Sequence, residues 1–164
     1  MGITTGNRRV SRTQRRRTLF VSYSGPLSRR IAQELCNLID EQLSIHVELF
    51  PNVPSAPLIP ELLEALTESD FGICCMTRDN ARSRWVYFEA GALLQASART
   101  GLEATRGTWP RIQPLYYPSR PEHGDPREDP LRNFHGIDAT PDGIARLFSG
   151  LARECGAPEP HSED

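Results

Sequence analysis

From Thr18 onward, short apolar runs alternate with segments of helical periodicity, a pattern typical of a parallel α/β sheet. The first run, Thr18 to Tyr23, predicts a strand, and Ser24 is suited to cap the helix that follows. Apolar residues recur in that helix at three- and four-residue steps, and we expect the stripe to face the sheet: Leu27, Ile31, Leu35, Leu38, Ile39 and Leu43. Ile45 to Phe50 predicts a second strand, which ends at Pro51.

The pattern then continues through a helix and a fully buried strand. Pro60 suits the first turn of a helix that ends at Asp70, with three residues packing inward: Leu62, Leu63 and Leu66. Phe71 to Thr77 is a nearly continuous apolar run, as expected of a central strand covered on both faces. Ser83 is suited to cap a long helix from about Arg84 to Ala98.

The remaining elements complete one domain. Ile112 to Tyr117 predicts a fourth strand, and Asp142 to Arg153 predicts the last helix. We find no internal repeat, and 164 residues are about one domain's worth of chain. The sequence therefore predicts a single doubly wound α/β domain with about four or five parallel strands flanked by helices.

The two ends of the chain differ from this domain in composition. Residues 1–17 hold six arginines and no acidic residue, which indicates a disordered arginine-rich arm, and residues 155–164 form a polar tail. The apolar run after the arginines is too short for an export signal. A formal charge of −2 disfavours a dedicated nucleic-acid binder, although the arm alone leaves weak association with nucleic acid or an acidic surface open.

Residue counts exclude several kinds of chemistry. All 19 basic residues are arginine, so a phosphate loop with its lysine, a Schiff base and pyridoxal attachment are excluded. Four cysteines without CxxC spacing indicate buried thiols of a reducing cytosol, and we expect a cytoplasmic protein. The scattered histidines lack ligand spacing, so we predict no metal. No apolar run reaches the roughly 20 residues that span a membrane.

Ligands of an open parallel sheet bind beyond the carboxyl ends of its strands. Three segments follow such ends: Tyr23-Ser24-Gly25, the proline-rich loop 51–57, and Thr77 to Arg84. Trp85 and Glu89 lie four residues apart in the next helix, so their side chains share one face, as an aromatic ring and a carboxylate suited to a ligand. The turn after the first strand has one glycine, and no GxSxG elbow occurs, which disfavours dinucleotide-fold dehydrogenases and serine hydrolases.

Two of these motifs resemble a known family. Phe20-Val21-Ser22-Tyr23-Ser24, together with Ser83-x-Trp85-x-x-x-Glu89-Ala-Gly-Ala-Leu, is similar to the Toll/interleukin-1 receptor (TIR) domain of the bacterial kind. The resemblance covers roughly residues 18–152 and implies that residues 18–154 form a TIR domain with a flavodoxin-like fold. It also implies hydrolysis of NAD+ at the nicotinamide–ribose bond, with Glu89 as the catalytic glutamate and NAD+ as substrate, not cofactor.

The expected substrate site follows from that resemblance and from the residues near it. Nicotinamide leaves NAD+ as a neutral molecule, so a single carboxylate can suffice to stabilise the positive charge that develops on the ribose. Trp85 could stack on nicotinamide, and Ser24 with the adjacent helix N-terminus could receive phosphates or ribose. We expect four further residues to bind substrate: Tyr23, Gly25, Phe50 and Arg84.

Other interpretations remain open at this stage. A glutamate taken from a helix at random is more often solvated than catalytic. Pro51, Pro54 and Pro57 replace the glycine and charge that many family members carry in the loop after the second strand, which puts loop closure and assembly in doubt. The resemblance implies self-association that completes the site, control by an activating partner or domain, and a role in bacterial immune defence. The alternatives are a non-enzymatic TIR–TIR adaptor and a nucleotide sensor without turnover.

Overall fold

The computed structural model describes residues 17–43, 45–49, 59–99, 111–118, 131 and 134–156. The rest of the arginine-rich arm, the proline-rich loop, Phe50 and most of the polar tail lie outside these residues. The described elements, in chain order, are β1 (Thr18–Ser22), α1 (Pro26–Leu43), β2 (His46–Leu49), α2 (Ile59–Glu68), β3 (Phe71–Thr77), α3 (Arg84–Arg99), β4 (Ile112–Tyr117), β5 (Ile137–Asp138) and α4 (Pro141–Cys155).

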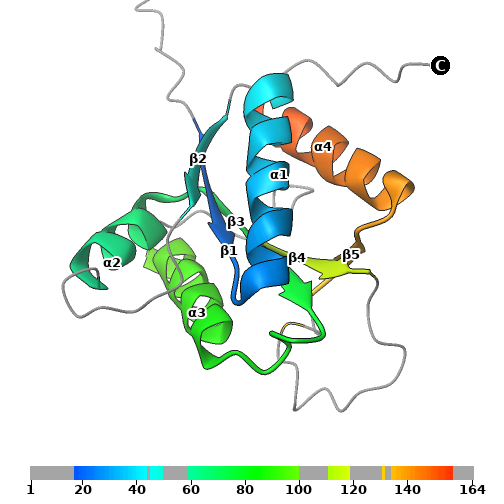
Figure 1. Ribbon diagram of the computed structural model, residues 1–164. Helices are drawn as coiled ribbons and strands as arrows, with labels where there is room; N and C mark the ends of the chain where they lie inside the picture. The colour runs from blue at the N-terminus through cyan, green and yellow to red at the C-terminus, as the bar shows by residue number, and fades with distance from the viewer. Residues whose placement is uncertain are drawn as a thin grey trace, which may run out of the picture.

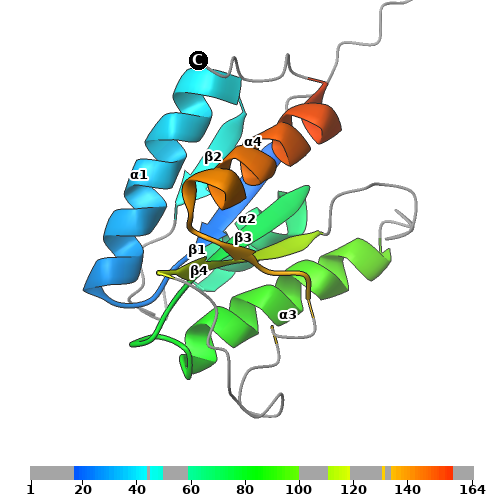
Figure 2. The same cartoon turned by 90° about the vertical axis from the view of Figure 1, so that its right-hand side faces the viewer.

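The strands form one five-stranded sheet in the order β2-β1-β3-β4-β5, and every described pair is parallel. This is the strand order of flavodoxin-like folds, which confirms the predicted α/β class. Figures 1 and 2 show α1 and α4 on one face of the sheet and α2 and α3 on the other. The order reverses at β1, so the helices that follow β1 and β3 lie on opposite faces, and their first residues meet the same edge of the sheet.

Two apolar layers hold the sheet between the helices. The α1–α4 layer buries alternate residues of β1 and β3, including Leu19, Val21, Ile73 and Cys75. The α2–α3 layer buries the intervening ones, including Phe20, Cys74 and Met76. This alternation is the two-residue period of a strand, and it decides which helix each strand residue contacts.

The predicted strands β3 and β4 match the structure to the residue, while several details differ. β1 ends at Ser22 instead of Tyr23, and the short strand β5 was not located from the sequence. α1 begins at Pro26, and the Gly25 carbonyl accepts the first helical hydrogen bond from the Arg29 N–H at 3.0 Å. The prediction that Ser24 caps this helix is therefore wrong. Ser83 does hold the cap position of α3, since its carbonyl accepts from the Tyr87 N–H.

Three leucines predicted to face the sheet are exposed. Leu27 and Leu38 of α1 each expose 39% of their surface, and Leu63 of α2 exposes 43%. Leu62 and Leu66 of α2 are buried, because they lie one helical turn apart on the face that meets the sheet. Leu63 is rotated away from that face and points toward solvent. The cysteines also differ in part: Cys74 and Cys75 are buried, whereas Cys36 and Cys155 are only half-buried, and all four are free.

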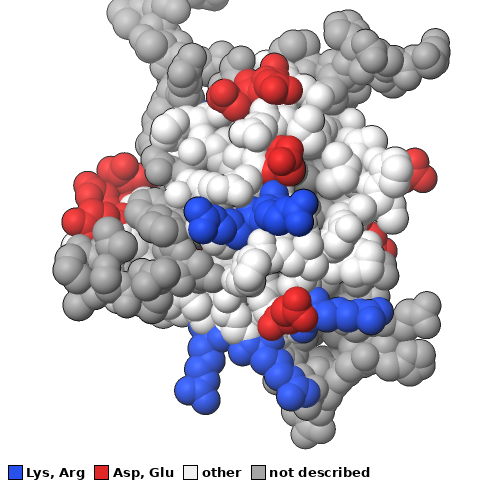
Figure 3. All heavy atoms as spheres, viewed as in Figure 1, with Lys and Arg blue, Asp and Glu red and all other residues white. Residues whose placement is uncertain are grey.

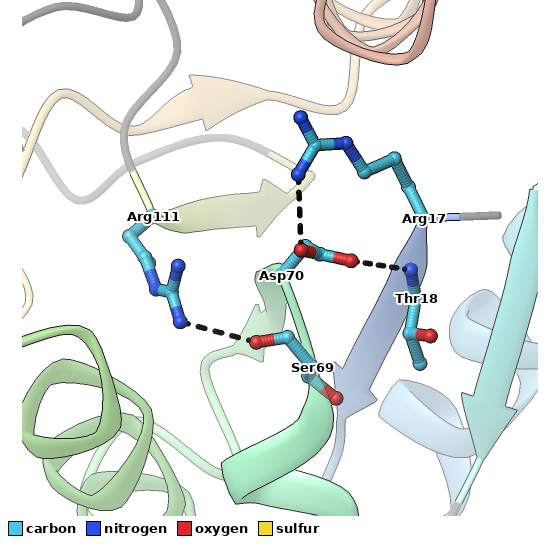
Figure 4. Close-up of polar contacts among 5 residues, drawn as sticks. All are labelled: Arg17, Thr18, Ser69, Asp70 and Arg111. Carbon is cyan, nitrogen blue, oxygen red and sulfur yellow. Dashed lines mark hydrogen bonds and ion pairs between the residues drawn. The ribbon is translucent and has the colours of Figure 1, made fainter. Parts of the chain in front are cut away.

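A polar cluster fastens the edge of the sheet where the strands begin (Figure 4). The Thr18 N–H donates to Asp70 Oδ2 at 2.9 Å, and the Asp70 N–H donates to the Thr18 carbonyl at 2.8 Å. Arg17 pairs with Asp70 Oδ1 at 3.1 Å, and Arg111 donates to the Ser69 carbonyl at 3.2 Å. These contacts join the starts of β1, β3 and β4. Within the described part of the chain, no helix has the length and apolar content needed to cross a membrane.

Candidate functional site

The site is built where α3 crosses the end of β1. Tyr23 and Val21 of the first strand segment face the α1–α4 layer, whereas Phe20 faces the α2–α3 layer. By the same alternation Ser22 lies under α3. Its register partner on β3 is Cys74, which belongs to the α2–α3 layer. A hydroxyl and a thiol therefore lie side by side beneath α3, at the carboxyl end of β1 and in the middle of β3.

Glu89 comes to this place from the buried stripe of α3. Val86, Ala90 and Leu93 of the helix are packed against the sheet, and Glu89 falls within the same stripe. Only 2% of its surface is exposed. Glu89 is therefore not the solvated glutamate of an ordinary helix surface, and the buried carboxylate needs hydrogen-bond partners.

One side chain supplies such a partner. The Ser22 hydroxyl, 1% exposed, donates a hydrogen bond to Glu89 Oε2. The Trp85 side chain, one turn earlier in α3, also favours the charged form of the carboxylate. The hydrogen-bond donor thus comes from the sheet, and the second stabilising group comes from the helix that carries the glutamate.

Burial raises the pKa of Glu89 from 4.5 to about 7, and the hydrogen bond from Ser22, together with the nearby Trp85 side chain, limits the rise by favouring the charged form. A carboxylate with this pKa changes charge near neutral pH, which is common at functional sites. Burial, together with the nearby Glu89, raises the pKa of the Cys74 thiol well above its ordinary value. Cys74 therefore stays protonated and is no nucleophile at neutral pH.

The turns after β1 and β3 are tied together beside this pair. The Ser83 hydroxyl donates to the Ser24 hydroxyl at 3.0 Å, and the Ser24 N–H donates to Ser28 Oγ at 3.3 Å. Asn80 holds the second turn by accepting from the Thr77 N–H at 2.7 Å and donating to the Cys75 carbonyl at 2.8 Å. The Thr77 hydroxyl, at the end of β3, is buried without a hydrogen-bond partner among the described residues.

Arginine side chains surround these turns. Arg78, Arg82 and Arg84 are exposed on the turn after β3 and the start of α3, together with the exposed acid Asp79. Figure 3 shows basic side chains projecting at the lower edge of the view, below α3, while acidic side chains gather over α2. The first turns of α1 and α3 contain no acidic residue. The positive ends of both helices and the arginines favour an anionic ligand at this edge.

The structure brings some of the predicted site residues together and separates others. Glu89 and Trp85 are in contact, and Ser24 joins their neighbourhood through Ser83. Arg84 is exposed at the first position of α3, and Gly25 is exposed with a φ of 89°. Tyr23 is buried in the α1–α4 layer, on the opposite face of the sheet from Glu89. Phe50 lies outside the described residues.

Two features of the site were not predicted from the sequence. The first is the hydrogen bond between Ser22 and Glu89. The strand alternation that places Ser22 on the same face as Phe20 is a signal for its face, but no sequence signal shows which helix residue it meets. The second is a ring pair: Trp85 stacks on Phe88 with ring centroids 5.5 Å apart, and Phe88 leaves 44% of its surface exposed.

A groove of about 410 Å³ lies elsewhere, on the α1–α4 face. Its walls come from α1, β4 and the start of α4, and its lining includes the exposed Leu27, Leu38 and Tyr117. Glu89 does not line it. The exposed leucines of α1, Leu27 and Leu38, therefore line a groove instead of packing against the sheet. This groove is separate from the Glu89 carboxylate.

Comparisons with known proteins leave the family open. No protein-family model matches the sequence, and no curated protein matches it. Among solved structures, the chain is similar to one in the activated Roq1 resistosome directly recognizing the pathogen effector XopQ (TIR domains). The two share 17% sequence identity with a TM-score of 0.43, over 84% of this chain and 67% of that one. A likeness at this level says nothing about what the chain binds or catalyses.

Proposed function

We propose that residues 18–154 form a TIR domain that hydrolyses NAD+ at the nicotinamide–ribose bond, with Glu89 as the catalytic carboxylate. The observation that carries this proposal is the buried Glu89 carboxylate, which accepts a hydrogen bond from Ser22 at the carboxyl end of β1 and lies beside Trp85. A buried carboxylate with no ion pair among the described residues is costly to a fold even when it is hydrogen-bonded, and such groups are common at functional sites. The sequence motif around Trp85 and Glu89 supports the same chemistry.

The reaction needs little more than one carboxylate. The bond between C1′ of the ribose and the nicotinamide nitrogen breaks, and its electron pair stays on that nitrogen, so nicotinamide leaves neutral. The ionised Glu89 stabilises the positive charge that develops on the ribose. Water then attacks C1′ and loses a proton, which gives ADP-ribose; attack by the adenine of the same molecule would give a cyclic product instead.

The surroundings of Glu89 suit the other parts of NAD+. Trp85 is half-buried beside the carboxylate and offers a ring for the nicotinamide. We place the phosphates or the second ribose at Ser24 and the first turn of α1, near Gly25 and Arg84, where helix ends and arginines favour negative charge. Tyr23 would act from the far side of the sheet, by supporting β1, and would not touch the substrate.

Burial of Glu89 also bears on control. With 2% of its surface exposed, the carboxylate must become more accessible before a ribose can reach it. We propose that self-association through TIR–TIR contacts, or an activating partner, exposes the site. Turnover per molecule is then expected to rise with protein concentration.

The test is nicotinamide release from NAD+ by the purified protein over a range of concentrations. Glu89→Gln keeps the size of the side chain and removes its charge, and we expect at least a hundredfold loss of turnover with an unchanged circular dichroism spectrum. Glu64→Gln, at an exposed position of α2, is the matched control and should retain wild-type turnover. Turnover that survives in Glu89→Gln would contradict the proposed role.

The same burial favours one competing function. A carboxylate shielded from solvent could serve only to fix α3 to the sheet in a non-enzymatic TIR–TIR adaptor. Wild-type protein that self-associates but releases no nicotinamide at any concentration would support the adaptor. Binding of NAD+ with no product would instead support a nucleotide sensor.

A further inference from the structure

We infer that Ser22 is a positioning residue, which holds the Glu89 carboxylate in the orientation that meets the substrate. The inference rests on the proposed function and adds to it a residue that does not itself touch NAD+. Its basis is the bond from the Ser22 hydroxyl to Glu89 Oε2, between side chains that expose 1% and 2% of their surfaces.

The two side chains that stabilise the Glu89 carboxylate differ in what they anchor. Trp85 belongs to α3, so it moves with the helix that carries the glutamate. Ser22 is the last residue of β1 and is paired with Cys74 of β3 in the centre of the sheet. The Ser22 bond is therefore the contact that fixes the carboxylate relative to the sheet, and so relative to Ser24 two residues further along the chain.

The position of Ser22 is one where an apolar residue would otherwise be expected. Its neighbours in the α2–α3 layer include Phe20, Cys74, Met76 and Val86. A hydroxyl in such surroundings is costly unless it is hydrogen-bonded. Glu89 accepts that hydrogen bond, so each of the two polar side chains reduces the cost of burying the other.

A hydroxyl is also suited to a partner that titrates. It can donate to the ionised carboxylate and accept from the protonated one, whereas a methyl group can do neither. The other titratable side chains of this layer are Cys74 on β3, Tyr87 on α3 and Tyr116 on β4. Burial raises the pKa of Cys74, and the Tyr87 hydroxyl donates to the Ala81 carbonyl. Among the sheet residues of this layer, Ser22 is therefore the one whose substitution should change the pKa of Glu89 most directly.

The experiment compares Ser22→Ala, Ser22→Thr and Ser69→Ala. Ser69 is the matched control because it is equally buried but donates to the Ala65 carbonyl at the opposite edge of the sheet. Two quantities are measured: the pH profile of kcat for nicotinamide release, and the pKa of Glu89 from its carboxyl carbon resonance, which requires no turnover.

We expect Ser22→Ala to raise the Glu89 pKa by about 1 and so to move the rising limb of the kcat profile to higher pH. At the plateau of that profile, kcat should be about tenfold lower than in wild type, with KM nearly unchanged. Ser22→Thr should restore most of both, and Ser69→Ala should move neither. A wild-type pKa and kcat in Ser22→Ala would overturn the positioning role alone. If Ser22→Ala shifts the Glu89 pKa but the wild-type protein never releases nicotinamide, the proposed function is overturned. The positioning role of Ser22 in catalysis then falls with it.

Discussion

The Ser83 hydroxyl donates a 3.0 Å hydrogen bond to the Ser24 hydroxyl and so joins the turn that starts α3 to the turn that starts α1. Ser83 directly precedes α3, the helix that carries Trp85 and Glu89. Ser24 lies two residues after the end of β1. The contact thus lies beyond the carboxyl ends of two neighbouring strands, where open α/β sheets bind their ligands. It sets how the phosphate end of the proposed site lies relative to the carboxylate.

Removal of this contact should weaken substrate binding more than chemistry. In Ser83→Ala, the Ser24 side chain loses a partner worth about 1 kcal/mol, so we expect KM for NAD+ to rise about fivefold while kcat changes less than twofold. Steady-state kinetics measure both. Thr67→Ala, which removes an exposed hydroxyl of α2, is the control. An unchanged KM would remove Ser24 from the proposed substrate contacts.

The raised pKa of Glu89 predicts a pH dependence of stability. Between pH 4.5 and about 7 the folded chain keeps a proton on Glu89 that the unfolded chain has released. The stability linked to this group is therefore fully present below pH 4.5 and is lost as the pH rises through about 7, a change of about 3 kcal/mol at most. Urea unfolding at pH 4 and pH 8 should show this loss in wild type, and a smaller one in Glu89→Gln. Parallel changes in the two proteins would contradict the prediction.

Gly143 permits the close approach of α4 to β5. A Cβ at this position would collide with the Asp138 carbonyl oxygen and would lie 3.0 Å from Ile137 Cγ2. Since the main obstacle is backbone, we expect Gly143→Ala to lower the free energy of unfolding by about 3 kcal/mol. Gly91→Ala is the matched control, because a Cβ on this exposed residue of α3 meets nothing within 4 Å, and it should stabilise the chain by about 0.5 kcal/mol. Chemical denaturation decides; equal stabilities of the two variants would contradict this account.

Asp70 should contribute to stability without affecting turnover. Asp70→Ala deprives the Thr18 N–H and Arg17 of their partner, and we expect a loss of about 1–2 kcal/mol. The backbone contact should account for most of it, because the Arg17 side chain is 42% exposed and exposed ion pairs contribute little. Arg17→Ala should therefore cost less than about 1 kcal/mol. A tenfold fall in kcat for Asp70→Ala would contradict the separation of this cluster from the site.

The long buried elements could be predicted from the sequence because each has a strong local signal. Phe71–Thr77 is a nearly continuous apolar run after Asp70, Ile112–Tyr117 is mostly apolar between Arg111 and Pro118, and both strands match. β5 has two residues, which is too short for any periodicity to be visible. The sequence predicts too many inward-facing leucines. A stripe of three- and four-residue steps covers more of the helix surface than the sheet can contact, so its outer members stay exposed: Leu27, Leu38 and Leu63.

The candidate site could be predicted only as far as local spacing reaches. Trp85 and Glu89 share a face because they are one helical turn apart, and the structure brings them into contact. Ser22 and Tyr23 are neighbours in sequence but lie on opposite faces of the sheet. The partner of Ser22 depends on where α3 crosses β1, which is set by the packing of residues 67 positions apart.

The pairing of β1 with β3 decides on which face of the sheet Ser22 lies. A shift of β1 by one residue would turn Tyr23 toward α3 and bury the Ser22 hydroxyl among the leucines under α1, because neighbouring strand residues face opposite ways. The reciprocal bonds between Thr18 and Asp70 form at the first residue of the strand in this same alignment. A chain misaligned by one residue would lack the Ser22–Glu89 pair even if it were compact, whereas loss of the Asp70 side chain alone leaves the two buried faces of β1 to hold the alignment.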